Sequence, residues 1–252
     1  MNQAEIIFDT KIDHLLDLGN ASVRKIYNLA FCLLSSKKFF LFLEEQMQKK
    51  EIKLQIIAEI AIFSALAFAL DILQSGLFRG LFPNGGSIGI AMIPVLVISY
   101  RRGLIPGLIC GLIVSLLQML GGIYAIADKW YLVILQVMLD YVVAYPLVAF
   151  AGVFYKSYQK AEKNSQKIKY LWLGTILGGM LKLASHYAAG VIFWSYTCPE
   201  NFLGGPLVYS LVYNGAYMIP NIILSAIILI IIDKKQPTIL NPNIKDLALT
   251  EE

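Results

Sequence analysis

An apolar stretch near residues 171–196 carries polar and aromatic side chains at a regular spacing. Lys182, His186, Gly190 and Trp194 follow one another at intervals of four residues. In a helix this spacing drifts by only about 40° per step, so the four residues form one slowly turning stripe. The faces of an imidazole and an indole can contact flat rings and cations. The stripe therefore predicts one wall of a ligand pocket, with Gly190 leaving a hollow between the two rings.

Polar residues in the two neighbouring apolar segments add to this stripe. Asp140 lies in the segment before it, and the segment after it begins with three polar residues, Tyr209, Ser210 and Asn214. A charged side chain near the bilayer centre costs about 2.5–3.5 kcal/mol on insertion scales, so Asp140 and Lys182 are expected to face the interior and pair. A carboxylate beside aromatic faces suits a flat, cationic ligand that donates hydrogen bonds.

The composition explains why such residues lie among apolar ones. Hydrophobic residues make up 58% of the 252 residues and charged residues only 15%, and the mean hydropathy is +0.65. These values predict a polytopic all-α membrane protein. The net charge of +4 comes from short basic clusters between apolar runs, which argues against nucleic-acid binding. Two histidines and three scattered cysteines predict neither a metal centre nor a bound cofactor.

Six apolar segments follow one another along the chain. They cover roughly residues 54–74, 88–100, 103–122, 131–155, 171–196 and 207–232. A length of ~1.5 Å per residue gives the second segment about 20 Å, short of a ~30 Å hydrocarbon core, so it is expected to span only partly. The sequence thus predicts a six-helix bundle over residues 51–235, a cytoplasmic or interfacial extension over 1–50 and a cytoplasmic tail over 236–252.

Basic residues indicate the orientation of this bundle in the membrane. Lysines and arginines gather before the first segment, between the second and third, between the fourth and fifth, and after the sixth. The positive-inside rule therefore places both termini in the cytoplasm of a plasma-membrane protein. At ~1.5 Å per residue, Asp140 and His186 then lie about 13 and 15 Å from the outer surface, at nearly the same depth.

Two stripes of small residues predict close helix contacts. Ala61 and Ala65 lie four residues apart in the first segment, and Gly103, Gly107 and Gly111 repeat the spacing in the third. Small faces let helix backbones approach closely within a membrane. For the glycines the favoured interpretation is internal packing, whereas the alanines form a candidate docking face for another membrane subunit.

The six segments together resemble one family, the thiamine-specific substrate-binding subunits (S-components) of energy-coupling factor (ECF) vitamin transporters. The resemblance spans about residues 54–232 and is carried by five stretches: EIAIFSALAFAL, IAMIPVLVISYRRGLIPGLICG, QVMLDYVVAYPLVAFAGVF, KLASHYAAGVIFW and YSLVYNGAYMIP. It implies a six-helix S-component without catalytic activity. Such a protein captures thiamine from outside and docks on a coupling membrane subunit that carries two ATPases.

The resemblance also implies the residues of the site and of the docking face. The family's ligand-binding motif falls on Asp140, Tyr141, Lys182, His186, Gly190, Trp194, Tyr209, Ser210 and Asn214. The alanine motif that docks the coupling subunit falls on Ala61 and Ala65. The family's acid at position 140 is glutamate, one methylene longer than Asp140. The loop SGLFRGLFPNGGSI resembles the family's lid over the site, although its sequence matches least well.

Other interpretations of the same residues stay open at this point. Asp140 and Lys182 could be a structural pair, and Trp194 a residue of the interfacial aromatic belt. The ligand could be a thiamine precursor or another vitamin. A membrane enzyme using Asp140, His186 and Lys182 lacks any supporting catalytic motif, and a solitary ion-coupled transporter lacks an inverted repeat.

Overall fold

The computed structural model describes residues 37–78 and 80–242. These residues form helices joined by turns and loops, with no strand among them, which confirms the all-α expectation. In chain order the elements are α3 (Lys37–Phe78), α4 (Ile93–Arg102), α5 (Leu104–Leu120), α6 (Trp130–Val137), the π-helical turn η1 (Met138–Val142), α7 (Ala144–Val148), the 3₁₀ segment η2 (Ala149–Phe154), α8 (Tyr155–Gln159), α9 (Asn164–Phe193), the 3₁₀ turn η3 (Ser195–Thr197), α10 (Gly205–Lys235) and α11 (Pro237–Leu240).

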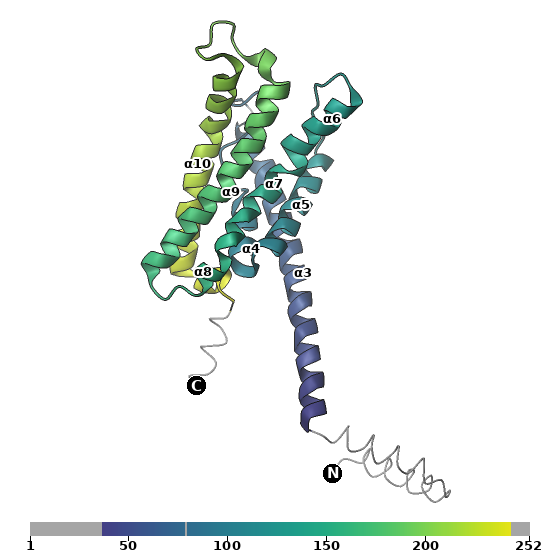
Figure 1. The fold of residues 1–252 in the computed structure, drawn as a ribbon, viewed down its shortest axis with the longest axis vertical. Helices are drawn as coiled ribbons and strands as arrows, with labels where there is room; N and C mark the ends of the chain where they lie inside the picture. The colour runs from purple at the N-terminus through teal and green to yellow at the C-terminus, as the bar shows by residue number, and fades with distance from the viewer. Residues whose placement is uncertain (1–36, 79, 243–252) are drawn as a thin grey trace, which may run out of the picture. The chain divides into compact units, whose positions relative to one another are not determined.

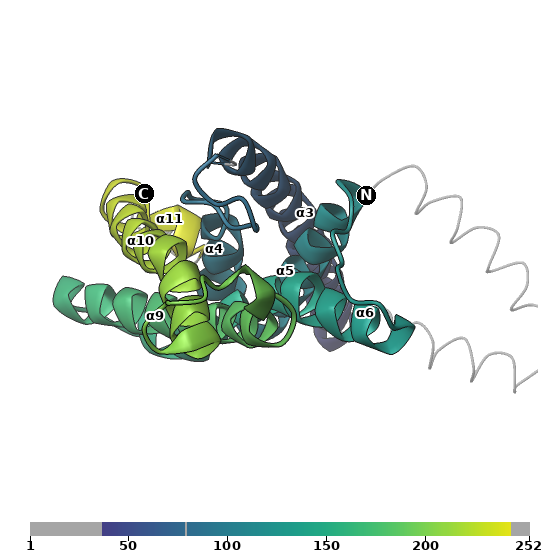
Figure 2. The ribbon, with the colours of Figure 1, turned by 90° about the horizontal axis from the view of Figure 1, so that it is seen from above.

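The chain divides into two compact units after Gln55. The second unit begins at Ile56, within α3, and contains every later helix. In it α9 and α10 run side by side, and α9 also packs against α7 and η2 (Figures 1 and 2). All features described below belong to this second unit.

Four helical stretches in the described residues are long and apolar enough to cross a membrane. They cover Lys53–Phe78, Trp130–Gln159, Asn164–Phe193 and Gly205–Lys235. The other two predicted segments are the shorter helices α4, with 10 residues, and α5, with 17 residues. Each of the six apolar segments therefore contains a helix, but a count of six full membrane spans is not confirmed.

The short helix α4 lies inside the bundle instead of crossing it. Its residues from Ile93 to Tyr100 are all buried, and Pro94 lies in its first turn, where the missing N–H costs nothing. The chain then turns at Gly103, which has a φ of +92° and leads directly into α5. At about 15 Å, α4 covers only half of a ~30 Å hydrocarbon core.

The stretch Trp130–Gln159 is helical but irregular in its middle. Val143 N–H bonds to the carbonyl of Met138 at 2.9 Å, a step of five residues that defines the π turn η1. Pro146 follows in α7, where it has no N–H to donate and its ring crowds the carbonyl four residues earlier. The helix adjusts around this proline, and such adjustments often occur at functional sites.

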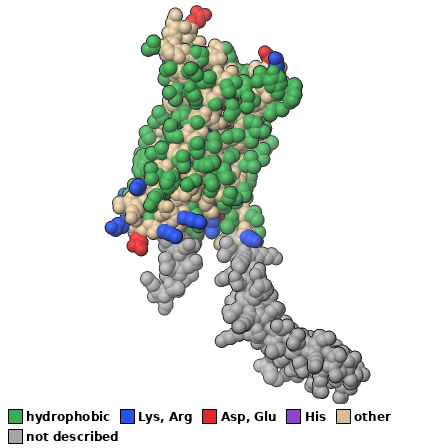
Figure 3. Space-filling view, in the orientation of Figure 1, with side chains coloured by type: hydrophobic (Ala, Val, Ile, Leu, Met, Phe, Trp, Pro, Cys, Tyr) green, Lys and Arg blue, Asp and Glu red, His purple; other side chains and the backbone are tan. Residues whose placement is uncertain are grey.

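The surface of this unit is predominantly apolar between its two ends. Hydrophobic side chains cover the face shown in Figure 3, and Lys and Arg side chains gather at the end where α8 and α11 lie. At that end Glu59 bridges Arg101 at 2.8 Å and Arg102 at 2.6 Å, and Arg101 also donates to the carbonyl of Thr238 in α11. This cluster ties α3, α4 and α11 together.

The glycine stripe of α5 lies in the bundle interior. A Cβ at Gly111 would meet the backbone of Pro146, and one at Gly107 would meet Ser99 and Ala149. The interpretation of these glycines as internal packing residues is therefore confirmed.

Candidate ligand-binding site

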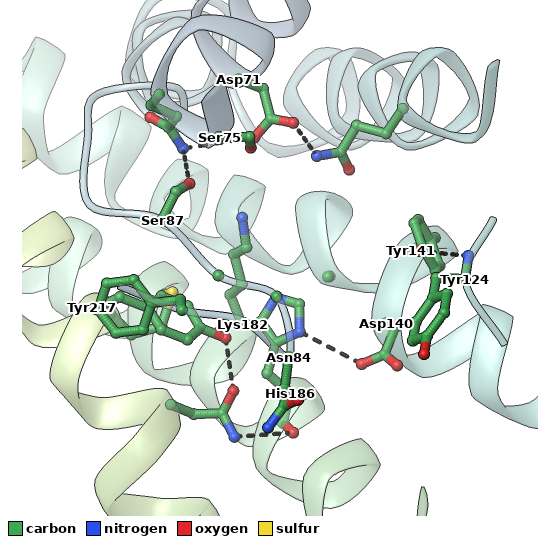
Figure 4. Close-up of a pocket in the computed structure, with 18 of the residues that line it drawn as sticks. Asp71, Ser75, Asn84, Ser87, Tyr124, Asp140, Tyr141, Lys182, His186 and Tyr217 are labelled. Atoms are coloured by element: carbon green, nitrogen blue, oxygen red, sulfur yellow. Dashed lines mark hydrogen bonds and ion pairs between the residues drawn. The ribbon is translucent and has the colours of Figure 1, made fainter. Parts of the chain in front are cut away.

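A cavity of about 980 Å³ lies in the second unit, next to the N-terminal end of α4. Its walls come from α3, the loop 80–92, the end of α5, η1, α7, α9 and α10. This volume is at the upper end of the range typical for small-molecule sites. All nine ligand-binding residues predicted from the sequence line this cavity, and Figure 4 shows several of them together.

The π turn presents Asp140 to the stripe on α9. The carboxylate Oδ1 of Asp140 lies 3.7 Å from Nδ1 of His186 (Figure 4). Its Oδ2 accepts a long hydrogen bond of 3.5 Å from the indole N–H of Trp194. The hydroxyl of Ser185 donates to the carbonyl of Leu139 at 2.6 Å. This bond fixes the backbone beside Asp140, because a π turn leaves carbonyls without their usual helical partners.

Lys182 does not pair with Asp140 as the sequence suggested. Its ammonium lies 3.6 Å from the ring centroid of Tyr145, a cation–π contact, and no carboxylate of the described residues lies within 4 Å of it. The hydroxyl of Tyr145 in turn donates to Asp71 at 2.7 Å. The expected pairing of Lys182 with Asp140 is therefore wrong: Lys182 contacts Tyr145 of α7, and Asp140 contacts His186 and Trp194.

Gly190 has a different role from the predicted hollow, although it does line the cavity. A Cβ at this position would collide with the hydroxyl of Ser210 and crowd the amide of Asn214 on α10. The absence of a side chain thus lets α9 and α10 approach closely. Gly190 brings the polar residues of α10 up to the stripe instead of opening space beside it.

The polar residues of α10 form a connected set beside His186. Ser210 donates to the carbonyl of Tyr187 at 3.0 Å, and the amide of Asn214 donates to the carbonyl of Ser210 at 2.9 Å. The side-chain oxygen of Asn214 accepts the hydroxyl of Tyr217 at 2.6 Å. These bonds hold Asn214 in one orientation at the cavity wall.

Aromatic rings line much of the same cavity. Trp194 stacks with Tyr124 at a centroid distance of 5.5 Å and with Tyr196 at 6.2 Å. His186 meets the ring of Tyr217 edge-on at 6.3 Å. Ring faces and edges of this kind can contact a flat, partly cationic ligand.

Tyr141 and Tyr209 complete the set of predicted residues. The hydroxyl of Tyr141 accepts the backbone N–H of Tyr124, which holds the loop after α5 at the cavity. Tyr209 packs edge-on against Phe202 at 5.3 Å. The structure thus brings all nine predicted residues to one cavity, and their ligand contacts remain predictions.

Sequence reasoning missed a second polar group in the cavity, centred on Asp71 of α3. Its carboxylate accepts hydrogen bonds from the hydroxyl of Tyr145 at 2.7 Å and from the amide of Gln118 at 2.6 Å. The amide of Gln74 donates a longer bond of 3.5 Å to the same carboxylate (Figure 4). An ionisable residue inside an apolar membrane segment marks a functional site by default. That rule, applied to the first apolar segment, would have found Asp71.

The stretch expected as a lid, residues 75–88, begins at the end of α3 and continues into the loop 80–92, which lines one side of the cavity. The loop's backbone N–H groups at Asn84, Gly89 and Ala91 donate to the side chains of Tyr213, Asn221 and Gln74, respectively. Irregular backbone at membrane depth is tolerated only where such partners or a cavity satisfy it. Phe82 packs edge-on against Tyr217 at 5.4 Å, which adds an apolar contact to these bonds.

Ala61 and Ala65 of α3 lie outside the cavity lining. Both are exposed, together with Ile62 and Leu66, whereas Ile60, Ser64 and Ala67 face the bundle and are buried. The small residues therefore form part of an outer face of α3.

These features together define a class of protein: an all-helical membrane protein that holds a preformed cavity with two carboxylates, one ammonium and several aromatic rings. Comparison with known proteins then identifies the family. Residues 57–241 match the family described as "Thiamine transporter protein". The chain belongs to this family, so it is a membrane transporter and not an enzyme, and the resemblance seen in the sequence is confirmed.

Relatives and a solved structure agree with this assignment. The chain is 36% identical to the thiamine transporter ThiT of Bacillus subtilis (strain 168) over 187 residues, which is 72% of this chain and 92% of that protein. It is 31% identical to ThiT of Lacticaseibacillus paracasei over 179 residues, 70% of this chain and 85% of that protein. A structure of ThiT from Listeria monocytogenes matches with a TM-score of 0.62 and 31% identity, and covers 75% of this chain and 99% of that one.

Proposed function

We propose that the chain binds thiamine in the cavity and carries it into the cell as the S-component of an ECF transporter. The observation that carries this proposal is the charge of the cavity. Among the described residues, its charged lining consists of Asp71, Asp140 and Lys182, beside the imidazole of His186. With that imidazole neutral, the cavity has one net negative charge, which complements the single positive charge of a thiazolium ring.

The arrangement of groups also fits the two rings of thiamine. Asp140 offers a carboxylate to the ligand's charged or N–H-bearing atoms, since its observed contacts are the distant His186 and the long bond from Trp194. Trp194 and His186 present ring surfaces on either side of this carboxylate. Trp194 is stacked on Tyr124, so a ligand ring that stacks on the same indole face would displace Tyr124.

Binding can be tested by titrating the purified protein with thiamine and following tryptophan fluorescence. We expect saturation below micromolar concentration, and Asp140→Asn should weaken binding by about 1–3 kcal/mol because a charge-assisted hydrogen bond is lost. Asp128→Asn is the matched control, since Asp128 is exposed and lies outside the cavity lining. Absence of binding below micromolar thiamine would refute the proposal.

The ligand class is tested by competition with the two halves of thiamine. A pyrimidine fragment, a thiazole fragment and other vitamins are each titrated against bound thiamine. Thiamine should compete better than either fragment, because it alone reaches both ring surfaces. If a fragment or another vitamin binds more tightly than thiamine, the chain would instead be an S-component for that compound.

Uptake requires a docking face and an energy source in other chains. The exposed alanines Ala61 and Ala65 on α3 are the proposed contact for the coupling membrane subunit, which is joined by two ATPases. Ala61→Trp should spare thiamine binding and abolish uptake in cells that contain the coupling module, because a large side chain prevents close helix contact. Ala216→Trp, at an exposed alanine of α10, should spare both.

Two results would contradict this part of the proposal. Normal uptake by Ala61→Trp would show that α3 does not dock in this way. Uptake into vesicles that contain this chain alone would show an independent transporter.

The proposed topology places both termini in the cytoplasm. It rests on the positive-inside rule, because basic residues gather at the end of the unit where α8 and α11 lie.

A further inference from the structure

The two acids of the cavity have different surroundings. Asp71 receives hydrogen bonds from Tyr145 and Gln118, from two different helices, whereas Asp140 lies beside His186 and the indole of Trp194. Figure 4 shows Asp71 and Asp140 on separate sides of the Lys182 and His186 side chains. The cavity therefore has two anionic positions with a cation between them.

Lys182 is linked to Asp71 through Tyr145. Its ammonium lies against the face of Tyr145, and the same tyrosine donates its hydroxyl to Asp71. The ring of Tyr145 and the charge of Asp71 thus draw the ammonium away from Asp140, because opposite charges attract strongly in a partly buried environment.

We propose that Asp71 determines the charge selectivity of the cavity: by neutralising Lys182 through Tyr145, it leaves Asp140 as the uncompensated charge for a monocationic ligand. The inference rests on the proposed function, since it assumes that the ligand lies in this cavity. Without the charge of Asp71, Lys182 would neutralise Asp140 across the cavity. The site would then have no net charge and no preference for a cation.

A structural role for Asp71 makes a different prediction. Asp71 joins α3 to α5 and α7 through its hydrogen bonds, so its loss could loosen the cavity. A loosened cavity would bind every ligand less well, whatever its charge. Charge selectivity is therefore measured as a ratio of affinities for two ligands of the same shape.

The experiment compares thiamine with an isostere in which a neutral aromatic ring replaces the thiazolium. For Asp71→Asn we expect thiamine to bind about 10- to 100-fold more weakly, as one unit of nearby charge is lost. The neutral isostere should change by less than about threefold. Gln118→Leu is the matched control: it removes a hydrogen bond to Asp71, keeps its charge, and should leave the ratio of the two affinities unchanged.

A reciprocal variant keeps the inference testable if Asp71→Asn destabilises the protein. Lys182→Met leaves two uncompensated carboxylates and should raise the preference for thiamine over the isostere. The double variant Asp71→Asn/Lys182→Met removes both charges of the pair, restores one net negative charge and should return the ratio to near its wild-type value.

The outcomes separate this inference from the proposed function. Wild-type protein that binds thiamine, with a ratio unchanged in Asp71→Asn and in Lys182→Met, overturns the role of Asp71 alone. An equal change of the ratio in Gln118→Leu also overturns it, because that variant keeps the charge. Wild-type protein that binds neither ligand overturns the proposed function and this inference together.

Discussion

Replacing Ser185 by alanine should weaken ligand binding although Ser185 is not among the residues that line the cavity. Its hydroxyl donates at 2.6 Å to the carbonyl of Leu139, directly before Asp140 in the π turn. Removing this donor takes a short hydrogen bond from that carbonyl in a buried, apolar environment. The turn can replace this bond only by changing its backbone conformation, which moves Asp140 away from the stripe on α9.

The magnitude follows from the hydrogen bond that is lost. An unsatisfied buried acceptor costs about 1–3 kcal/mol, and 1.4 kcal/mol corresponds to a factor of ten in affinity. Part of this cost also falls on the ligand-free protein. We therefore expect Ser185→Ala to bind thiamine about 5- to 30-fold more weakly, a factor within the range of these two figures.

The assay is isothermal titration of purified protein with thiamine, together with thermal unfolding in the same detergent. Ser225→Ala is the matched control, because Ser225 is buried in α10 and its hydroxyl has no hydrogen-bond partner among the described residues. That variant should keep wild-type affinity. If Ser185→Ala binds normally, or if Ser225→Ala loses as much affinity, the positioning role of the π turn is refuted.

Three further variants test other parts of the structure. Gly190→Ala should weaken thiamine binding by more than about tenfold, because the added Cβ collides with Ser210; Gly215→Ala, where a Cβ meets only an ordinary contact, should bind normally in the same titration. Tyr124→Ala should alter the fluorescence of Trp194 before ligand is added, since it removes a stacked ring, and unchanged emission would argue against that contact. Glu59→Gln should lower the thermal unfolding temperature without changing thiamine affinity, because it breaks two partly buried ion pairs far from the cavity; an equal loss of affinity would contradict this separation.

The stripe on α9 could be predicted because helical spacing alone fixes which residues share a face. Asp140 could be added because the lengths of two antiparallel helices fix its depth beside His186. Both inferences use only the rise and twist of a helix, which do not depend on side-chain conformation. The structure brings the stripe and Asp140 to one cavity, and Tyr141, predicted only through the family resemblance, lines it too.

The partner of Lys182 could not be predicted in the same way. A lysine has four rotatable bonds, so its ammonium can reach acids on several helices, and the choice depends on the position of Tyr145. The role of Gly190 likewise depends on how closely α10 approaches α9, which no single segment contains. Asp71 was missed for a different reason, because the first segment was interpreted only through its alanines.

The shortness of α4 has an electrical consequence. In the proposed orientation, α4 and the residues on its cytoplasmic side fill the inner half of the membrane layer with packed protein, and the cavity occupies the outer half. A membrane potential falls mainly across material that excludes water and ions, and moving one elementary charge through all of it involves about 2.3 kcal/mol per 100 mV. A cation that enters the cavity crosses little of this potential, so its affinity in detergent should hold at the voltage of a living cell. Voltage would then act on the delivery step, which carries the same charge through the remaining half.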